Sequence, residues 1–208
     1  MEKRIKELLD NWQKRNIQGF YFQDRQEAVN AILKLIPKGA SVGYSGSMTL
    51  SEIGLFRQLE GAGHKIFDPY RPGLSKEESL EIRREATQAD VYLASANAVS
   101  RRGELVFFSA YGNRTAGIAY ARRAIIVCGI NKLVDNLTEA LTRSRQYAAP
   151  LNCRRLNWQS ACFSDGICRE SVCLAPEYNR MCCQVLTIEA ETQPGRLTVV
   201  LIGEKLGY

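Results

Sequence analysis

The sequence has a single histidine, His64, among its 208 residues. A Ser-His-Asp triad, a Cys-His pair and a histidine-rich zinc site would each have to use that one imidazole. His64 lies in GAGHKI, where a helix is expected to give way to a strand, and this position is typical of a surface or capping residue. These three kinds of site are therefore disfavoured.

Long apolar runs are absent as well. No stretch approaches the roughly 18 consecutive apolar residues that a membrane helix needs. The opening residues, MEKRIKELLDNWQKR, lack the apolar region of a secretory signal peptide. We therefore expect no membrane span and a cytoplasmic location, where disulfides are disfavoured.

A concentrated basic stripe is the third absence. The net charge of +6 comes largely from scattered arginine pairs, with no run of basic residues interleaved with aromatic ones. Nucleic acid is therefore not expected as a partner. A site for a small anionic molecule accounts for the surplus equally well.

Helical and strand periodicity alternate over most of the chain, which predicts an α/β fold with a Rossmann-like, mainly parallel, doubly wound sheet. We expect a single domain over residues 1–208, in which residues 1–22 form a helix and a strand. AVSRRGELVFFS predicts a β-hairpin about Gly103. The expected strands are GFYF, ASVGYSG, KIFD, VYLASA, AIIVCG, QVLTIEA and RLTVVLIGE. The expected later helices are residues 50–61, SKEESLEIRREATQ, 115–123 and 135–147, the last ending before Pro150.

Two glycine-containing loops, GYSGSMTLSEIG and YGNRTAG, each follow a predicted strand and lead into a helix. Free N–H groups at helix starts favour anions, and open α/β sheets bind ligands at their strand ends. Neither loop is a Walker A or GxGxxG motif, so each alone is typical of a plain strand-to-helix turn. Their occurrence on adjoining strand ends favours a shared pocket.

Five of the seven cysteines fall between Ser160 and Cys183, and the spacing is C-x5-C-x4-C-x8-C-C. Four thiolates suit Zn²⁺ or a [4Fe–4S] cluster, but this spacing identifies neither. The alternative is that the cysteines are small buried hydrophobes. Cys128 lies in the apolar run AIIVCG and is expected in the core, and Cys153 is a weaker candidate ligand or redox thiol. Cys183 is expected to be a spare that packs inward.

Several longer blocks occur in order from about Arg4 to Tyr208. They are GYSGSMTLSEIG, SANAVSRRGELVFFSAYGNRTAG, GINKLVDNLTEAL, APLNCRRL and LIGEKLGY. Together they resemble the LUD domain family, named for lactate utilisation. The resemblance implies a fold similar to the NagB/RpiA/CoA-transferase-like group, and members include subunits of complexes that oxidise L-lactate alongside iron–sulfur partners.

The resemblance also implies a set of pocket residues and a set of metal ligands. The pocket would be lined by Ser45, Gly46, Ser47, Thr49, Asn97, Gly112, Asn113, Arg114, Asn131, Lys132 and Glu204. One branch of the family carries a cysteine run, which corresponds here to Cys162, Cys168, Cys173 and Cys182 within the cysteine-rich excursion 151–183. Four residues separate Cys168 from Cys173 where that branch has two, so the match is inexact.

Three functional hypotheses follow. The first is a protein that binds a small anion and takes part in lactate or organic-acid oxidation, with an iron–sulfur cluster for electron transfer to iron–sulfur partner subunits. The second is a stand-alone enzyme acting on a CoA thioester, a folate-like or a sugar-phosphate substrate, with structural zinc or no metal. The third is a regulatory or scaffold module with a vestigial pocket. The catalytic residues and the oligomeric state, a homo-oligomer included, stay open.

Overall fold

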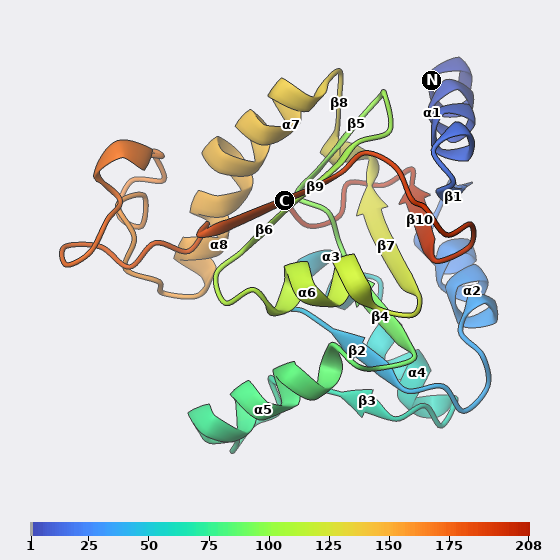
Figure 1. The fold of residues 1–208 in the computed structure, drawn as a ribbon, viewed down its shortest axis with the longest axis horizontal. Helices are drawn as coiled ribbons and strands as arrows, with labels where there is room; N and C mark the ends of the chain where they lie inside the picture. Colours follow the sequence, from blue (N-terminus) through green and yellow to red (C-terminus); the bar gives the residue numbers. More distant parts are fainter. Residues whose placement is uncertain (1) are drawn as a thin grey trace.

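The computed structural model of the chain describes residues 2–208 and builds them around a six-stranded parallel sheet (Figure 1). In spatial order its strands are β1 (Gln18–Phe22), β10 (Leu197–Ile202), β7 (Ala124–Gly129), β4 (Val91–Ala94), β2 (Val42–Tyr44) and β3 (Ile66–Phe67). Every residue of β7 and β10 is buried, as expected for parallel strands that are covered on both faces. The mainly parallel α/β sheet predicted from the sequence is confirmed.

Alternate strand residues divide the core between the two faces of this sheet, as the two-residue period of a strand requires. Leu93 and Val200 belong to a cluster that includes residues of α2, α3 and α4. Their neighbours Tyr92 and Val199 pack instead with α1, α6 and the second sheet. The helices are α1 (Glu2–Lys14), α2 (Arg25–Leu35), α3 (Met48–Glu52), α4 (Leu55–Gly61), α5 (Lys76–Ala86) and α6 (Asn113–Tyr120).

A smaller sheet lies against the second face. Its order is β8 (Leu133–Val134), β5 (Ala98–Ser100), β6 (Leu105–Ser109) and β9 (Gln184–Ile188). β5 and β6 form the expected antiparallel hairpin, and Gly103 in its turn has φ +106°, a conformation that favours glycine. Trp12 of α1 donates from its indole nitrogen to the carbonyl of Gly103 at 3.0 Å, which ties the N-terminal helix to this hairpin.

Two predicted helices differ from those observed. The helix expected over residues 50–61 is two helices, α3 and α4, because Gly54 between them adopts φ +69°. The helix expected to end before Pro150 instead continues as α7 (Leu137–Arg143), a π-helical turn (Ser144–Ala148) and α8 (Ala149–Arg155). Pro150 stands in the first turn of α8, directly after the π-helical turn, so the hydrogen bond that it cannot donate is lost where the chain changes from π-helix to α-helix.

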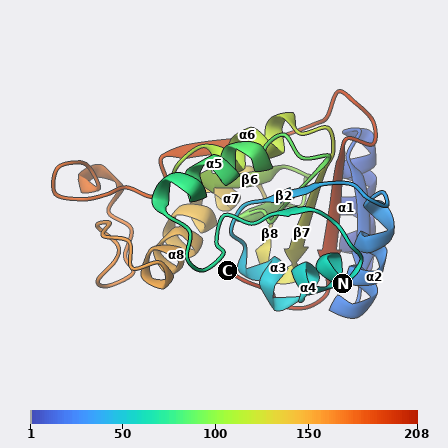
Figure 2. The same cartoon turned by 90° about the horizontal axis from the view of Figure 1, so that it is seen from below.

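The cysteine segment, which we define as residues 156–183, has little regular structure. Its only helical turn is Glu170–Val172. In Figures 1 and 2 this segment extends away from the sheets beyond α8. An excursion was expected over residues 151–183, but it begins later, because residues 151–155 complete α8. Among residues 2–208 no helix combines the length and apolarity needed to cross a bilayer.

Candidate functional site

A cavity of about 360 Å³ lies where chain segments leave the carboxyl ends of the strands. Ser45 and Gly46 follow β2, Asn97 follows β4, and Arg114 stands in the first turn of α6; all four line the cavity. Its other walls come from α5, the loop before α6, α8 and the cysteine segment. Open α/β sheets bind ligands at this edge, so the cavity is the candidate ligand site. We call it the acid pocket, because the positively charged arginines described next favour an acidic, anionic ligand.

Arg114 provides the charge of the acid pocket. Its guanidinium donates to Oγ of Ser45 at 3.2 Å and to the carbonyls of Gly46 and Phe108 at 2.5 and 3.2 Å. Oδ1 of Asn97 lies 3.5 Å from Nη1. All these acceptors are neutral, and burial lowers the pKa of Arg114 from its usual value. The guanidinium is therefore held rigidly with its charge uncompensated by these contacts.

Two further arginines line the pocket. Arg155 donates to the phenol oxygen of Tyr208 at 2.7 Å and to Oδ1 of Asn152 at 2.8 Å. Arg83 of α5 lies over the ring of Tyr70, 5.0 Å from its centroid. Within residues 2–208, none of the three cavity arginines has a carboxylate within ion-pair distance. The pocket is thus electropositive and favours an anion.

A separate buried polar cluster surrounds Lys132, which is 3% exposed. Its ammonium donates to Oγ1 of Thr49 at 2.9 Å and to Oγ of Ser95 at 2.8 Å. The C-terminal segment covers the cluster, since Thr49 donates to the carbonyl of Leu206 and Asn131 bonds both Leu206 and Gly207. Burial lowers the pKa of Lys132 to about 8.

The residues expected in one pocket therefore fall into separate places. Those lining the acid pocket are Ser45, Gly46, Asn97, Asn113 and Arg114. Thr49, Asn131 and Lys132 form the cluster beneath the C-terminal segment. Ser47 caps α3 by accepting from the amide of Leu50 at 3.2 Å, and Glu204 accepts from the backbone amide and Nε of Arg25, both at 2.7 Å.

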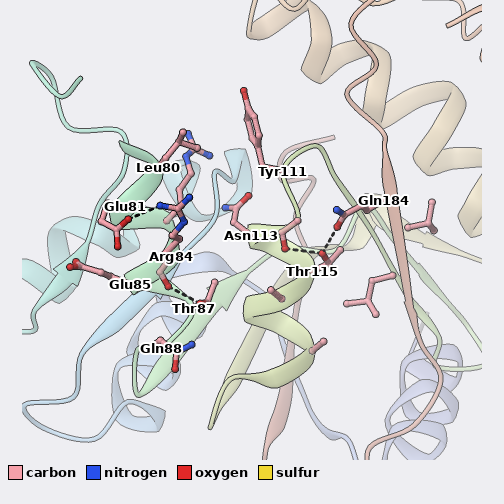
Figure 3. Close-up of a pocket in the computed structure, with 16 residues that line it drawn as sticks. Leu80, Glu81, Arg84, Glu85, Thr87, Gln88, Tyr111, Asn113, Thr115 and Gln184 are labelled. Carbon is pink, nitrogen blue, oxygen red and sulfur yellow. Dashed lines mark hydrogen bonds and ion pairs between the residues drawn. The ribbon is translucent and has the colours of Figure 1, made fainter. Parts of the chain in front are cut away.

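Gly112 lines a different space, an open groove of about 1220 Å³ between α5 and α6 that Asn113 also lines (Figure 3). Gly112 precedes α6 with φ +85°, in the region that favours glycine. On the α6 side, Thr115 donates to Gln184 of β9 at 2.9 Å. Arg83, Tyr111 and Asn113 line both this groove and the acid pocket, so the two spaces adjoin.

Five thiols of the cysteine segment and α8 line one narrow cavity. They belong to Cys153, Cys162, Cys168, Cys173 and Cys182. The amide of Ala161 donates to Sγ of Cys173 at 3.4 Å. Burial raises the pKa of Cys153 to about 12 and also raises that of Cys168. The expectation that Cys183 packs inward is wrong: its side chain is exposed and donates to the carbonyl of Arg180 at 2.9 Å, outside this cavity.

This thiol cavity has the donor set of a metal or cluster site, since thiolates are the ligands of zinc and of iron–sulfur clusters. Arg145, Arg169 and Arg180 surround it, and such cations compensate thiolate charge. The thiol cavity encloses about 10 Å³ of free space. Across residues 2–208, no three His, Cys, Asp or Glu side chains are placed to hold a metal ion. Binding would therefore require the segment to shift around its ligand.

Several residues of the acid pocket had no motif to reveal them. Arg83 and Arg155 belong to the scattered arginine pairs, and only the tertiary fold brings one member of each pair to the same cavity. Trp158 and Tyr111 also line the pocket, and no motif marked either of them as a pocket residue. The sequence predicted the helix that carries Arg83, SKEESLEIRREATQ, but gave no sign that this helix lines a cavity.

The family profile of the LUD domain matches residues 5–202. The structure is similar to that of a DUF162 family protein from Deinococcus radiodurans, with a TM-score of 0.56 at 13% identity, over 97% of this chain and 98% of that one. Ribose 5-phosphate isomerase A from Methanocaldococcus jannaschii and eIF2B beta from Chaetomium thermophilum each align with 55% of this chain at 16% identity. Their TM-scores are 0.36 and 0.38, and 56% and 44% of those chains are covered. No protein of curated function matches the sequence. Because the profile spans nearly the whole chain, the protein belongs to the LUD domain family.

Proposed function

We propose that this LUD-domain protein binds a small organic anion in the acid pocket and takes part in the oxidation of lactate or a related organic acid. Its cysteine segment would hold an iron–sulfur cluster, and the protein would act as an electron-transfer subunit beside iron–sulfur partner proteins. The observation that carries the binding step is the guanidinium of Arg114, whose protein contacts are all to neutral acceptors. A carboxylate is the natural partner of such a group.

The link between the acid and the cluster rests on a shared wall. Ala149, Met181 and Cys182 line both the acid pocket and the thiol cavity. Cys162, Cys168, Cys173 and Cys182 would hold the cluster, with Cys153 beside them. Such a cluster supplies one-electron transfer when bound. The protein's own residues would bind and orient the acid, and Cys182 would lie between the acid and the other thiols, since it lines both spaces.

Anaerobic purification followed by iron and sulfide analysis tests the cluster. We expect both elements together with a broad absorbance near ~400 nm. Cys182→Ser should remove this absorbance, whereas Cys183→Ser, which alters the adjacent thiol outside the cavity, should keep it. A colourless wild-type protein without iron would contradict the cluster.

Isothermal titration calorimetry with L-lactate and pyruvate tests the acid pocket. We expect Arg114→Gln to weaken binding at least tenfold, because it removes the charge that faces the acid. Arg57→Gln, on the exposed surface of α4 and outside the acid pocket, is the matched control and should bind as the wild type does. Equal affinity of both variants would contradict the assignment of Arg114.

The second candidate function is a stand-alone enzyme on a larger substrate, with zinc in the thiol cavity. The roughly 10 Å³ of free space among the thiols favours it, since a single ion needs less expansion than a cluster, and the open groove beside the acid pocket has room for a CoA thioester. Elemental analysis separates the two: zinc without iron or sulfide would favour this candidate.

A further inference from the structure

The walls of the acid pocket are aromatic. Tyr70, Phe108, Tyr111 and Trp158 all line it. Tyr111 and Trp158 meet edge to face with ring centroids 5.9 Å apart and an interplanar angle of 78°. Such a pair presents ring faces and edges to any molecule lying beside it.

Hydrogen bonds fix two of these rings, although the aromatic wall is partly open to solvent. The indole nitrogen of Trp158 donates to the carbonyl of Asn179 at 2.6 Å, and the hydroxyl of Tyr70 accepts from the amide of Gly46 at 2.8 Å. Tyr70 and Tyr111 are 46% and 54% exposed. Figure 3 shows the side chain of Tyr111 projecting away from α6, whose start it precedes. Apolar ring surface is therefore exposed to water at the pocket, and covering it with a ligand would be favourable.

Arg83 adds a planar cation to this wall. Its guanidinium lies 5.0 Å from the ring centroid of Tyr70 and 5.6 Å from that of Tyr111. Arginine stacked on aromatic rings accepts a further flat group well, because its planar face is weakly hydrated. Arg114 supplies the separate, hydrogen-bonded charge for a carboxylate.

The size of the pocket also bears on its occupant. Its volume of about 360 Å³ falls within the range of roughly 300–1,000 Å³ typical of sites for drug-sized ligands. A three-carbon acid such as lactate or pyruvate would contact Arg114 and leave the aromatic walls facing water. A ring attached to the same acid would cover them.

We infer that the acid bound here carries a flat ring, so that an aromatic 2-oxo or 2-hydroxy acid is preferred over pyruvate or lactate. This inference rests on the proposed function for the binding of the carboxylate. The ring would lie among Tyr70, Tyr111 and Trp158, with the carboxylate at Arg114. Burial of its apolar surface supplies the preference.

Calorimetric titration with phenylpyruvate, pyruvate and 2-phenylethanol tests the inference on the purified full-length protein. We expect phenylpyruvate to bind at least tenfold more tightly than pyruvate, and 2-phenylethanol, which has a ring but no acid, to bind more weakly than phenylpyruvate. Trp158→Leu and Tyr111→Leu should each reduce the preference for phenylpyruvate. Tyr120→Leu removes an aromatic side chain that is 94% exposed and outside the pocket, and should leave the preference intact.

The outcomes distinguish a failure of the ring preference from a failure of the proposed acid binding. Equal affinity for phenylpyruvate and pyruvate, both weakened by Arg114→Gln, would overturn the ring preference and leave acid binding standing. Absence of binding by every acid would overturn both. Because Tyr111 is more than half exposed, Tyr111→Leu is expected to fold normally and keeps the test valid if Trp158→Leu does not.

Discussion

The ammonium nitrogen of Lys132 lies 2.8 Å from the hydroxyl oxygen of Ser95, beneath the C-terminal segment and almost out of contact with water. Both hydrogen bonds of this lysine go to neutral hydroxyls, and burial disfavours its charged form. Protonation of Lys132 therefore places a charge in the protein interior and lowers the free energy of unfolding.

This effect predicts a pH dependence of stability. The pKa of Lys132 falls from 10.5 to about 8 on folding, so between these values the unfolded chain binds a proton that the folded chain does not. Stability then rises with pH, by about 3 kcal/mol across the window. Lys132→Met should lack this gain. Urea unfolding at pH 7 and pH 10 measures the free energy of unfolding of the wild type and of Lys132→Met. If the difference in stability between the two proteins were the same at both pH values, the prediction would be wrong.

A tight contact in α6 gives a second prediction. A Cβ at Gly117 would lie 2.3 Å from the ring of Tyr92, which is fully buried. Gly117→Ala should therefore destabilise the protein by about 1–3 kcal/mol, as overpacking does. Tyr92 also donates to the carbonyl of Asn113 at 3.1 Å, so the start of α6 should shift and weaken acid binding at Arg114.

The control for this change is Gly61→Ala in α4, where no atom lies within 4 Å of the added Cβ. There the substitution should stabilise the protein by about 0.5–1 kcal/mol, because alanine favours a helix over glycine. Thermal unfolding of both variants distinguishes them. If Gly117→Ala and Gly61→Ala changed the unfolding temperature by a similar amount in the same direction, the close packing described for Gly117 in α6 would be wrong.

The sequence and the structure agree best where a pattern has one physical cause. AIIVCG is apolar throughout because parallel strands are covered on both faces, and β7 follows from it directly. Helix ends were less predictable: Pro150 ends a helix in isolation, but a preceding π-helical turn lets it open α8 instead. Local helix propensity does not predict such a turn, because the turn depends on tertiary packing.

The site shows the same division. Loop chemistry placed Ser45 and Arg114 together, since strand ends and helix starts meet at one edge of the sheet. The resemblance separated Cys182, which lines the thiol cavity, from the spare Cys183, but spacing could not show that Cys183 is exposed, because adjacent side chains in an irregular segment have no fixed alternation. Arg155 reaches the acid pocket only through the position of α8, which no motif encodes.

A third prediction concerns Asn97, whose Oδ1 accepts from the amide of Phe108 at 2.9 Å and lies 3.5 Å from Nη1 of Arg114. Asn97→Asp keeps both acceptor contacts and places a carboxylate beside the guanidinium. Pyruvate binding should weaken at least tenfold because the new carboxylate neutralises the guanidinium of Arg114 and lowers the positive charge of the pocket. The free energy of unfolding should increase by about 1 kcal/mol, as expected of a charge-assisted hydrogen bond partly offset by desolvation.

Asn136→Asp makes the same chemical change elsewhere. Asn136 caps α7 by accepting from the amide of Glu139 at 3.0 Å and does not line the acid pocket. The affinity of the Asn136→Asp variant for pyruvate should equal that of the wild type. If Asn97→Asp also left affinity unchanged in calorimetric titration, Arg114 would not be the group that binds the acid.

The last prediction concerns removal of the metal. The cysteine segment has one short helical turn, and its thiols enclose little free space, so its order in the loaded protein would come from the ligand they hold. Anaerobic protein with its cluster should resist trypsin at Arg169, whose side chain is 45% exposed. Protein stripped of metal by oxidation and chelation should be cleaved there at least several-fold faster, while the sheets stay intact.

Two variants sharpen this measurement. Cys182→Ser should be cleaved at the metal-free rate even when purified anaerobically, and Cys183→Ser should match the wild type, because only the first thiol faces the cavity. Cleavage sites identified by mass spectrometry should cluster within residues 156–183. Equal rates for loaded and stripped protein would mean that the segment is ordered by its own contacts, among which are the ion pairs of Arg145 and Arg180 with Glu170. The thiols would then be packing groups, and the electron-transfer role would lose its support.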